Sequence, residues 1–337
     1  MKAVGYLKNQ AIEAADALID LELPKPTAAG RDLLVAVHAI SVNPVDTKVR
    51  KNAPPPEGQP KILGWDAVGV VEAVGPDVTL FKVGDEVFYA GSIARQGANA
   101  EYHLVDERIV GHKPKSLSAA DAAALPLTSI TAWELLFDRL GVAPGKRHDA
   151  GHLLIIGGAG GVGSILIQLA RRLTGLTVIA TASRPETREW CLSLGAHHVI
   201  DHSKPFLDQI KAIGIPQVEY VASLTATAQH FKDIVEVVAP QGKMLLIDDP
   251  ATLDVMPLKR KAVSLHWELM FTRSLFETPD MIEQHYLLDE VADLIDAGVI
   301  RTTVGEHLGK INAANLKKAH TLIESGKAKG KVVLEGF

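Results

Sequence analysis

The sequence has a single cysteine, no long apolar run and no long basic run, and each absence excludes a class of protein. Cys191 cannot form an internal disulfide, and we expect it to pack as a small hydrophobe in a helix over residues 186–194. No apolar run approaches the roughly 20 residues that span a bilayer, and the N-terminus carries no apolar signal segment. We therefore expect a cytoplasmic protein without a membrane partner.

The charge balance excludes another class of partner. The formal net charge is −5 and the basic residues are dispersed. Affinity for phosphate polymers comes mainly from clustered Lys and Arg side chains. We therefore expect no nucleic-acid partner and a small molecule as the ligand.

A cluster of glycines follows the apolar run 152–156 and opens an amphipathic segment. Gly158, Gly160 and Gly163 fit the pattern G-x-G-x-x-G between a strand and a helix, which is typical of a dinucleotide site. The other interpretation is a glycine-rich turn in an ordinary α/β domain, but the strand before it and the helix after it favour the cofactor. The residues expected at the pyrophosphate are Gly158, Gly160, Gly161, Val162 and Gly163.

The end of the next predicted strand, 177–181, bears on which dinucleotide is bound. An NAD site usually places an acid about 20 residues after the motif, for the ribose diol. This chain has Ser183 and Arg184 there, and a hydroxyl beside a guanidinium suits a 2′-phosphate. The sequence therefore predicts NADP(H). The alternative is that Arg184 only opens the next helix, with Pro185 in its first turn.

The order of predicted elements indicates an α/β protein with two domains. Short β segments fill the first half, at 33–39, 67–74 and 86–89. Strands then alternate with helices, which predicts a doubly wound parallel sheet with strands at 153–156, 177–181, 198–200, 218–223 and 243–247. The tail has helices at 280–296 and 313–325 and a strand at 331–334 that we expect to rejoin the first domain. The predicted domains are 1–125 with 263–337, and 126–262.

Six short motifs are spread over nearly the whole chain. They are 41–47 (SVNPVDT), 63–69 (LGWDAVG), 74–78 (VGPDV), 83–87 (VGDEV), 157–163 (GGAGGVG) and 330–334 (GKVVL). Together they resemble the medium-chain dehydrogenase/reductase superfamily, in its quinone oxidoreductase (zeta-crystallin-like) branch and a bacterial subgroup labelled zinc-type alcohol dehydrogenase-like. The resemblance implies a Rossmann domain inserted into a GroES-like, mainly antiparallel β catalytic domain.

The resemblance also identifies the positions that hold the catalytic zinc in zinc enzymes of the superfamily. They fall here on Asn43, on Trp65 and near Leu127, none of which supplies a thiolate or an imidazole. The structural zinc lobe needs four cysteines, and the chain has one. His197 and His198 lie on or beside a short strand, where neighbouring side chains point to opposite faces. The prediction is an enzyme without a metal.

A metal-free member of this superfamily suits substrates in which less charge must be stabilised. Hydride addition to a quinone or to the β-carbon of an enone spreads the charge over a conjugated oxygen. By resemblance, the Asn43 amide would donate to the substrate oxygen, Thr131 would contact the nicotinamide, and Lys331 would bind the cofactor. Asn43 could equally be a turn residue before Pro44.

Further candidates follow from the same resemblance. Relatives often have a Tyr where this chain has Lys48, so Lys48 is a candidate proton donor or, alternatively, a solvated charge. Asp46 lies near the former metal position and could pair with Lys48, and Asp66 lies in the same region. Trp65 and Phe271 would form apolar walls for a flat substrate, or belong to the core.

Two other functions and an oligomeric state stay open. The same fold and cofactor could reduce simple aldehydes or ketones, or the protein could bind nucleotide with little catalysis. The segment 262–270 is apolar and β-prone, so it could be an edge strand that pairs with its copy in a homodimer, or an interior strand.

Overall fold

The computed structural model describes residues 1–147 and 150–337, which divide into two compact units. Unit 1 contains Met1–Ile130 and Phe271–Phe337, and unit 2 contains Thr131–Met270. The expected insertion of a Rossmann domain into a mainly antiparallel domain is confirmed. The predicted boundaries at residues 125 and 262 stay predictions. Within the described residues, no helix has both the length and the apolar character needed to cross a membrane.

Unit 1 is built on two sheets. The smaller sheet is antiparallel, in the order β2 (Ile19–Glu22), β1 (Lys2–Tyr6), β4 (Lys61–Ile62). The larger sheet runs in the order β15 (Val304–His307), β16 (Lys331–Glu335), β3 (Asp32–Val42), β5 (Ala67–Val74), β6 (Glu86–Tyr89), β8 (Val110–His112), with β7 (Tyr102–Asp106) also paired to β3. Only β15 and β16 pair in parallel among these strands.

The long strand β3 organises this sheet. We expected this strand over 33–39, but its apolar run continues to Val42. These added residues pair with β16, with Leu334 opposite Ile40. The C-terminal strand therefore returns to the first domain, as predicted. This pairing also brings Lys331 beside the end of β3, because Val332 is in register with Val42.

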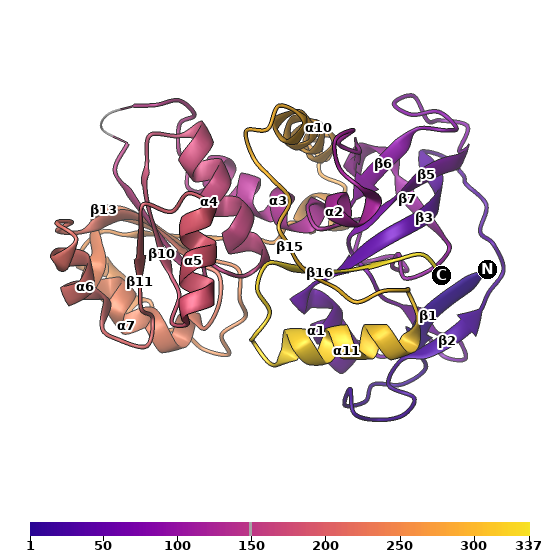
Figure 1. Ribbon diagram of the computed structural model, residues 1–337, viewed down its shortest axis with the longest axis horizontal. Coiled ribbons are helices and arrows are strands. Elements are labelled where there is room, and N and C mark those ends of the chain that lie inside the picture. Colours follow the sequence, from indigo (N-terminus) through magenta and orange to yellow (C-terminus); the bar gives the residue numbers. More distant parts are fainter. Residues whose placement is uncertain (148–149) are drawn as a thin grey trace. The chain divides into compact units, whose positions relative to one another are not determined.

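The helices of unit 1 lie against these sheets. They are α1 (Pro44–Asn52), α2 (Ala119–Ala123), α3 (Pro126–Trp133, which continues into unit 2), α9 (Thr272–Leu275), α10 (Glu283–Asp296) and α11 (Ala313–Glu324), with a 3₁₀ turn at Glu107–Ile109. Helices α1 and α11 lie side by side (Figure 1), and the buried Arg50 guanidinium of α1 pairs with Glu324 of α11. Helix α10 was expected from residue 280. It begins at Glu283 because the preceding amides close shorter turns, such as Met281 N to Thr278 O.

Unit 2 is a single parallel sheet of six strands. The order is β11 (His198–Ile200), β10 (Thr177–Thr181), β9 (His152–Ile156), β12 (Val218–Ser223), β13 (Val238–Leu246), β14 (Ser264–Trp267). In chain order this is 3-2-1-4-5-6, the doubly wound arrangement of dinucleotide-binding domains. Its helices are α4 (Gly161–Leu173), α5 (Pro185–Ser193), α6 (Phe206–Ala212), α7 (Thr227–Val237) and α8 (Met256–Lys259). Helices α6 and α7 pack together (Figure 1).

Strand β14 lies at an edge of this sheet, so the interpretation of residues 262–270 as an interior strand is wrong. Trp267 at the end of this strand is 59% exposed, and Leu269, two residues after it, is 53% exposed, which is unusual for large apolar side chains at a sheet edge. Cys191 is buried in α5, as expected, and burial raises the pKa of its thiol to about 12.

Candidate functional site

The glycine turn after β9 has the shape that its sequence predicts. Gly157 has φ of +84°, a left-handed conformation that favours glycine. A Cβ on Gly158 would lie 2.7 Å from the Cβ of Ala180, and one on Gly163 would lie 2.5 Å from the carbonyl oxygen of Gly157. Close packing between strand and helix therefore accounts for glycine at positions 158 and 163.

Gly160 differs from these two glycines. A Cβ there would meet only the carbonyl oxygen of Gly157, at an ordinary distance of 3.6 Å, and the backbone is extended, with φ −73° and ψ 177°. Packing and backbone strain thus do not require glycine at this position. The space above the backbone is free for a ligand at the start of α4, where the first amides of a helix point outward. The residues fit a dinucleotide pyrophosphate.

The end of β10 supports this turn. The amide of Gly157 donates to Thr181 Oγ1 at 3.1 Å, and the amide of Gly158 donates to the carbonyl oxygen of Thr181 at 3.2 Å. Thr181 Oγ1 also lies 3.3 Å from His202 Nδ1, a contact that the sequence did not reveal. These residues lie at the carboxyl ends of β9, β10 and β11, the edge where doubly wound sheets bind ligands.

Ser183 and Arg184 follow at the same edge. Ser183 is exposed, and Arg184 immediately precedes α5, so Arg184 does open the next helix with Pro185 in its first turn. Its Nε lies 3.0 Å from Glu186 Oε1 in a largely exposed ion pair. Contact with a 2′-phosphate stays a prediction. Such a contact would place Glu186 close to a second anion.

In unit 1, Asp66 is the centre of a fully buried polar cluster. Its Oδ2 accepts from Ser41 Oγ at 2.7 Å and from Asn43 Nδ2 at 2.8 Å. The Lys331 ammonium lies 3.0 Å from the same oxygen, and Oδ1 accepts from the amide of Leu127 at 2.7 Å. The carboxylate thus joins four segments of the chain.

Lys331 is itself buried and directed inward, with 3% exposure. Besides Asp66, its ammonium donates to Asn43 Oδ1 and to the carbonyl oxygen of Val42, the latter at 3.2 Å. These three acceptors match its three protons. Cofactor contact by Lys331 stays a prediction, and it would require the ammonium to exchange one of these acceptors.

The side-chain amide of Asn43 is also fully hydrogen-bonded. Its Nδ2 donates to Asp66 and, at 3.3 Å, to the carbonyl oxygen of Trp65, while its Oδ1 accepts from Lys331. It also precedes α1 in a capping box with Asp46, so it is a turn residue before Pro44 as well. Both amide protons are thus directed to partners within the protein. Donation to a substrate oxygen stays a prediction.

Asp46 is buried beside this cluster. Its two carboxylate oxygens accept from the amides of Asn43 at 2.7 Å and Gly64 at 2.9 Å. Burial raises the pKa of Asp46 to about 7, against the lowering effect of the Asn43 amide and the Lys331 charge. Lys48 is exposed on α1, so the proposed Asp46–Lys48 pair would join a buried group to an exposed one.

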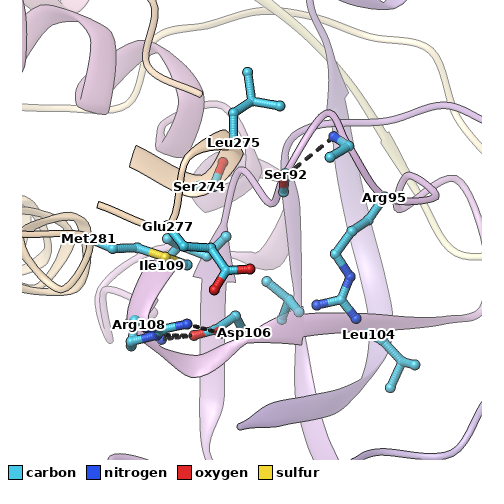
Figure 2. Close-up of a pocket in the computed structure, with 12 residues that line it drawn as sticks. Ser92, Arg95, Leu104, Asp106, Arg108, Ile109, Ser274, Leu275, Glu277 and Met281 are labelled. Carbon is cyan, nitrogen blue, oxygen red and sulfur yellow. Dashed lines mark hydrogen bonds and ion pairs between the residues drawn. The ribbon is translucent and has the colours of Figure 1, made fainter. Parts of the chain in front are cut away.

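The predicted aromatic walls lie in the core of unit 1. Trp65 and Phe271 are 1% and 2% exposed and meet edge to face, with ring centroids 6.2 Å apart. Trp65 Nε1 donates to the carbonyl oxygen of Ser92 at 3.2 Å, and Ser274 Oγ donates to that of Phe271 at 3.1 Å. Both aromatics therefore adjoin, through these serines, the pocket of Figure 2.

That pocket has charged and apolar walls. Arg108 pairs with Asp106 in it (Figure 2), and Arg95 makes a bidentate pair with Asp32 at 2.7 and 2.8 Å. Paired guanidiniums attract an anion weakly. The lining residues are Ser92, Ala94, Arg95, Leu104, Val105, Asp106, Arg108, Ile109, Ser274, Leu275, Glu277 and Met281.

Unit 2 holds a second buried acid cluster, which the sequence did not reveal. Glu134 and Arg139 lie on a π-helical turn, Glu134–Arg139, and Glu268 follows the edge strand β14. Arg139 Nε lies 2.8 Å from Glu268 Oε2, and Arg139 Nη2 lies 3.8 Å from Glu134 Oε2. Burial, and next the charge of Glu134, raises the pKa of Glu268 to about 9. Thr131, predicted at the nicotinamide, is buried three residues before Glu134.

Comparison with known proteins identifies the family. Residues 29–115 match the alcohol dehydrogenase GroES-like domain, and residues 194–334 match the zinc-binding dehydrogenase family. A zinc-type alcohol dehydrogenase-like protein of Staphylococcus aureus is 43% identical over 336 residues, 99% of each chain. This chain belongs to the medium-chain dehydrogenase/reductase superfamily. The resemblance read from the motifs is thus confirmed, and the protein is an oxidoreductase of this superfamily.

Three further proteins are similar to this dehydrogenase/reductase over nearly its whole length. A candidate zinc-dependent alcohol dehydrogenase from Rhizobium etli CFN 42 has 62% identity and a TM-score of 0.96, over 100% of this chain and 98% of that one. A mycobacterial protein solved with NADPH has 28% identity and a TM-score of 0.84, over 99% and 100%. The 2-methylene-furan-3-one reductase of Solanum lycopersicum is 30% identical over 344 residues, 99% of this chain and 79% of the reductase.

Zinc appears in the descriptions of two of these relatives, but the residues of this dehydrogenase/reductase do not fit zinc at the expected positions. Asn43 has its amide fully bonded, Trp65 offers an indole, and Leu127 offers an alkyl side chain. Within residues 1–147 and 150–337, no group of three or more His, Cys, Asp or Glu side chains is placed to hold a metal ion. Zinc independence of the reaction stays a prediction.

Proposed function

We propose that this oxidoreductase uses NADPH to reduce quinones or α,β-unsaturated carbonyl compounds without zinc. The observation that supports this most is the chemistry of the Asn43, Trp65 and Leu127 side chains, which offer zinc neither a thiolate nor an imidazole. Asp66 accepts from Asn43 Nδ2 and from the amide of Leu127. A conjugated acceptor delocalises the charge that follows hydride addition, so it needs a donor and not a Lewis acid. The 30% identity to a 2-methylene-furan-3-one reductase is consistent with an enone substrate.

NADPH is the proposed cofactor because the glycine turn suits its pyrophosphate and the end of β10 suits its 2′-phosphate. Gly160 leaves room above the backbone for the pyrophosphate, and Ser183 and Arg184 offer donors to a 2′-phosphate. A neighbour in fold and sequence was solved with NADPH. The cofactor supplies the hydride. The chain supplies the binding site and the proton.

The proton donor that we propose is Lys48. Its side chain is exposed on α1, where an ammonium can exchange its proton with solvent. Thr131, Trp65 and Phe271 keep their proposed positions at the nicotinamide and the substrate ring. Asn43, at the start of α1, then also positions Asp66, in addition to its proposed contact with the substrate oxygen.

Reduction of simple aldehydes is the second candidate, favoured by the alcohol dehydrogenase descriptions of the relatives at 43% and 62% identity. NADPH consumption against 1,4-benzoquinone, phenanthrenequinone, 2-alkenals and simple aldehydes, with and without a metal chelator, separates the two. We expect activity on the conjugated acceptors that survives chelation. Activity on simple aldehydes that chelation abolishes would overturn the proposal.

A matched pair of glycine variants tests the cofactor site apart from the reaction. Gly160→Ala should keep the stability of the protein, because its Cβ meets no close neighbour, but should lower NADPH affinity roughly tenfold or more. Gly158→Ala should instead lower stability, because its Cβ would lie 2.7 Å from that of Ala180. Thermal unfolding and NADPH titration by fluorescence measure both. Unchanged NADPH affinity in Gly160→Ala would argue against the site.

We also propose that the exposed edge strand β14 pairs with its copy in a homodimer. Trp267 and Leu269 would then be covered by the second copy. Sedimentation of the purified protein and of Trp267→Glu tests this. A monomeric native protein would refute it.

A further inference from the structure

The proposed 2′-phosphate site at the end of β10 carries an acid beside its guanidinium. We propose that Glu186 competes with the 2′-phosphate of NADPH for Arg184, and that it thereby narrows the preference of this protein for NADPH over NADH. This inference rests on the NADPH site of the proposed function. It concerns which of the two dinucleotides binds, not which acceptor is reduced.

The ion pair occupies the group that the phosphate needs. Arg184 Nε lies 3.0 Å from Glu186 Oε1, and both side chains are partly exposed. A guanidinium binds a phosphate best when two of its N–H groups form parallel bonds to it. Because Nε is already directed to a carboxylate, Arg184 must give up that contact or hold two anions at once. Either course makes NADPH binding weaker than the guanidinium by itself would make it.

The start of α5 keeps both groups in place. The carbonyl oxygen of Arg184 accepts from Thr187 Oγ1 at 2.9 Å and from the amide of Arg188 at 3.0 Å, so the first turn of the helix fixes its backbone. Glu186 lies in that same turn, where the positive end of the helix dipole favours a carboxylate. The helix dipole and the guanidinium thus both attract the acid, and both would also attract a phosphate.

The neighbouring hydroxyl does not discriminate in this way. Ser183 is exposed, and its Oγ makes no hydrogen bond within residues 1–147 and 150–337. A hydroxyl can donate to a phosphate oxygen or exchange a hydrogen bond with a ribose hydroxyl. Ser183 therefore suits both dinucleotides, whereas the pair of Arg184 and Glu186 responds to the added charge of NADPH.

Binding titrations by fluorescence test the competition without any acceptor. Glu186→Gln removes the charge but keeps the size of the side chain, so NADPH affinity should rise about threefold to tenfold while NADH affinity stays within about twofold. Glu189→Gln, also exposed on α5, is the matched control and should leave the ratio of the two affinities unchanged. An unchanged ratio in Glu186→Gln, or a fall in NADH affinity without a rise in NADPH affinity, would overturn the inference.

A double-mutant cycle shows whether Arg184 carries the effect. In an Arg184→Gln background, Glu186→Gln should change the ratio of NADPH to NADH affinity by less than about twofold, because no guanidinium is left to compete for. An equal rise in NADPH affinity with and without Arg184 would show a general effect of charge and would also overturn the inference. Thermal unfolding of each variant verifies that folded proteins are compared.

These readouts distinguish this inference from the proposed function. Dinucleotide affinities do not depend on which acceptor is reduced. Coupling between Arg184 and Glu186 with chelator-sensitive aldehyde activity would keep the competition and refute the proposed reaction. Chelator-resistant quinone activity without coupling would do the reverse.

Discussion

Each unit of this protein buries an acid cluster, and the two clusters compensate differently for the cost of burying a carboxyl group. In unit 1, Asp66 is surrounded by four donors, of which Lys331 is fully buried. In unit 2, Glu268 lies against a second acid, Glu134, and a single guanidinium of Arg139 faces both. The first cluster balances its charge with a buried cation. The second takes up a proton.

The difference teaches how location in the fold sets the partners of a buried acid. Asp66 lies where four segments meet, so amide, hydroxyl and ammonium donors reach it from several directions. Glu268 follows an edge strand, and burial together with the neighbouring Glu134 raises the pKa of its carboxyl. Arg139 faces two carboxyl groups in unit 2, whereas Lys331 lies against a single one, Asp66, in unit 1.

The largest effect is expected from breaking the balanced cluster. Asp66→Ala leaves the Lys331 ammonium buried without its anion and deprives Ser41, Asn43 and Leu127 of an acceptor. We expect a loss of about 3–5 kcal/mol in the free energy of unfolding, measured by urea titration. The exposed Asp77→Ala is the control and should change it by less than about 0.5 kcal/mol. Similar effects of the two would mean that Asp66 is not the centre of the cluster.

The acid cluster around Glu268 should make the stability of the protein depend on pH. Glu268 has a folded pKa of about 9 against a reference of 4.5, so it keeps its proton in the folded state while the unfolded chain loses it. Its contribution to stability is complete below pH 4.5 and is lost as the pH rises through about 9. Glu268→Gln should therefore match the wild type near pH 4.5 and exceed it in stability near pH 9.

Urea titrations across this pH range provide the measurement for Glu268→Gln. The exposed Glu189→Gln serves as the control and should follow the wild type at every pH. Parallel pH profiles for wild type and Glu268→Gln would show that Glu268 is ionised in the folded protein. In that case the two clusters would not differ in protonation.

The smallest effect is expected from removing one of the four donors to Asp66. Ser41→Ala deletes a buried hydrogen bond of 2.7 Å to the carboxylate, which should cost about 1–2 kcal/mol. Ser116→Ala deletes a similar bond to Asp296 at the surface, 2.6 Å long, and should cost less than about 0.5 kcal/mol. The pair isolates the effect of burial. Equal losses would show that the remaining three donors already satisfy Asp66.

Much of the fold was predictable because it depends on local patterns. The strands at 67–74, 177–181, 198–200 and 218–223 have the predicted bounds, since β-branched and apolar runs end there at turn residues. The glycine turn was also predictable, because a strand, tight turn and helix need glycines at fixed spacing. Strand β3 was predicted too short, as its last residues are fixed by pairing with β16, far away in the chain.

The candidate site was predicted less completely than the fold. The resemblance identified Asn43, Asp46, Asp66 and Lys331 as separate candidates, but their mutual contacts join residues up to 288 positions apart. No local pattern reports such a contact. Glu134, Arg139 and Glu268 gave no signal at all, because each is an ordinary charged residue until the fold buries the two carboxyl groups beside the guanidinium.

The sequence by itself determined the family, the order of the elements and the place of the glycine turn, because these depend on short-range periodicity and on backbone conformations that few residues allow. The tertiary structure alone decided which way the polar groups of the site point and which of them carry charge. Those properties depend on burial and on donors brought from distant segments, and both exist only once the chain has folded.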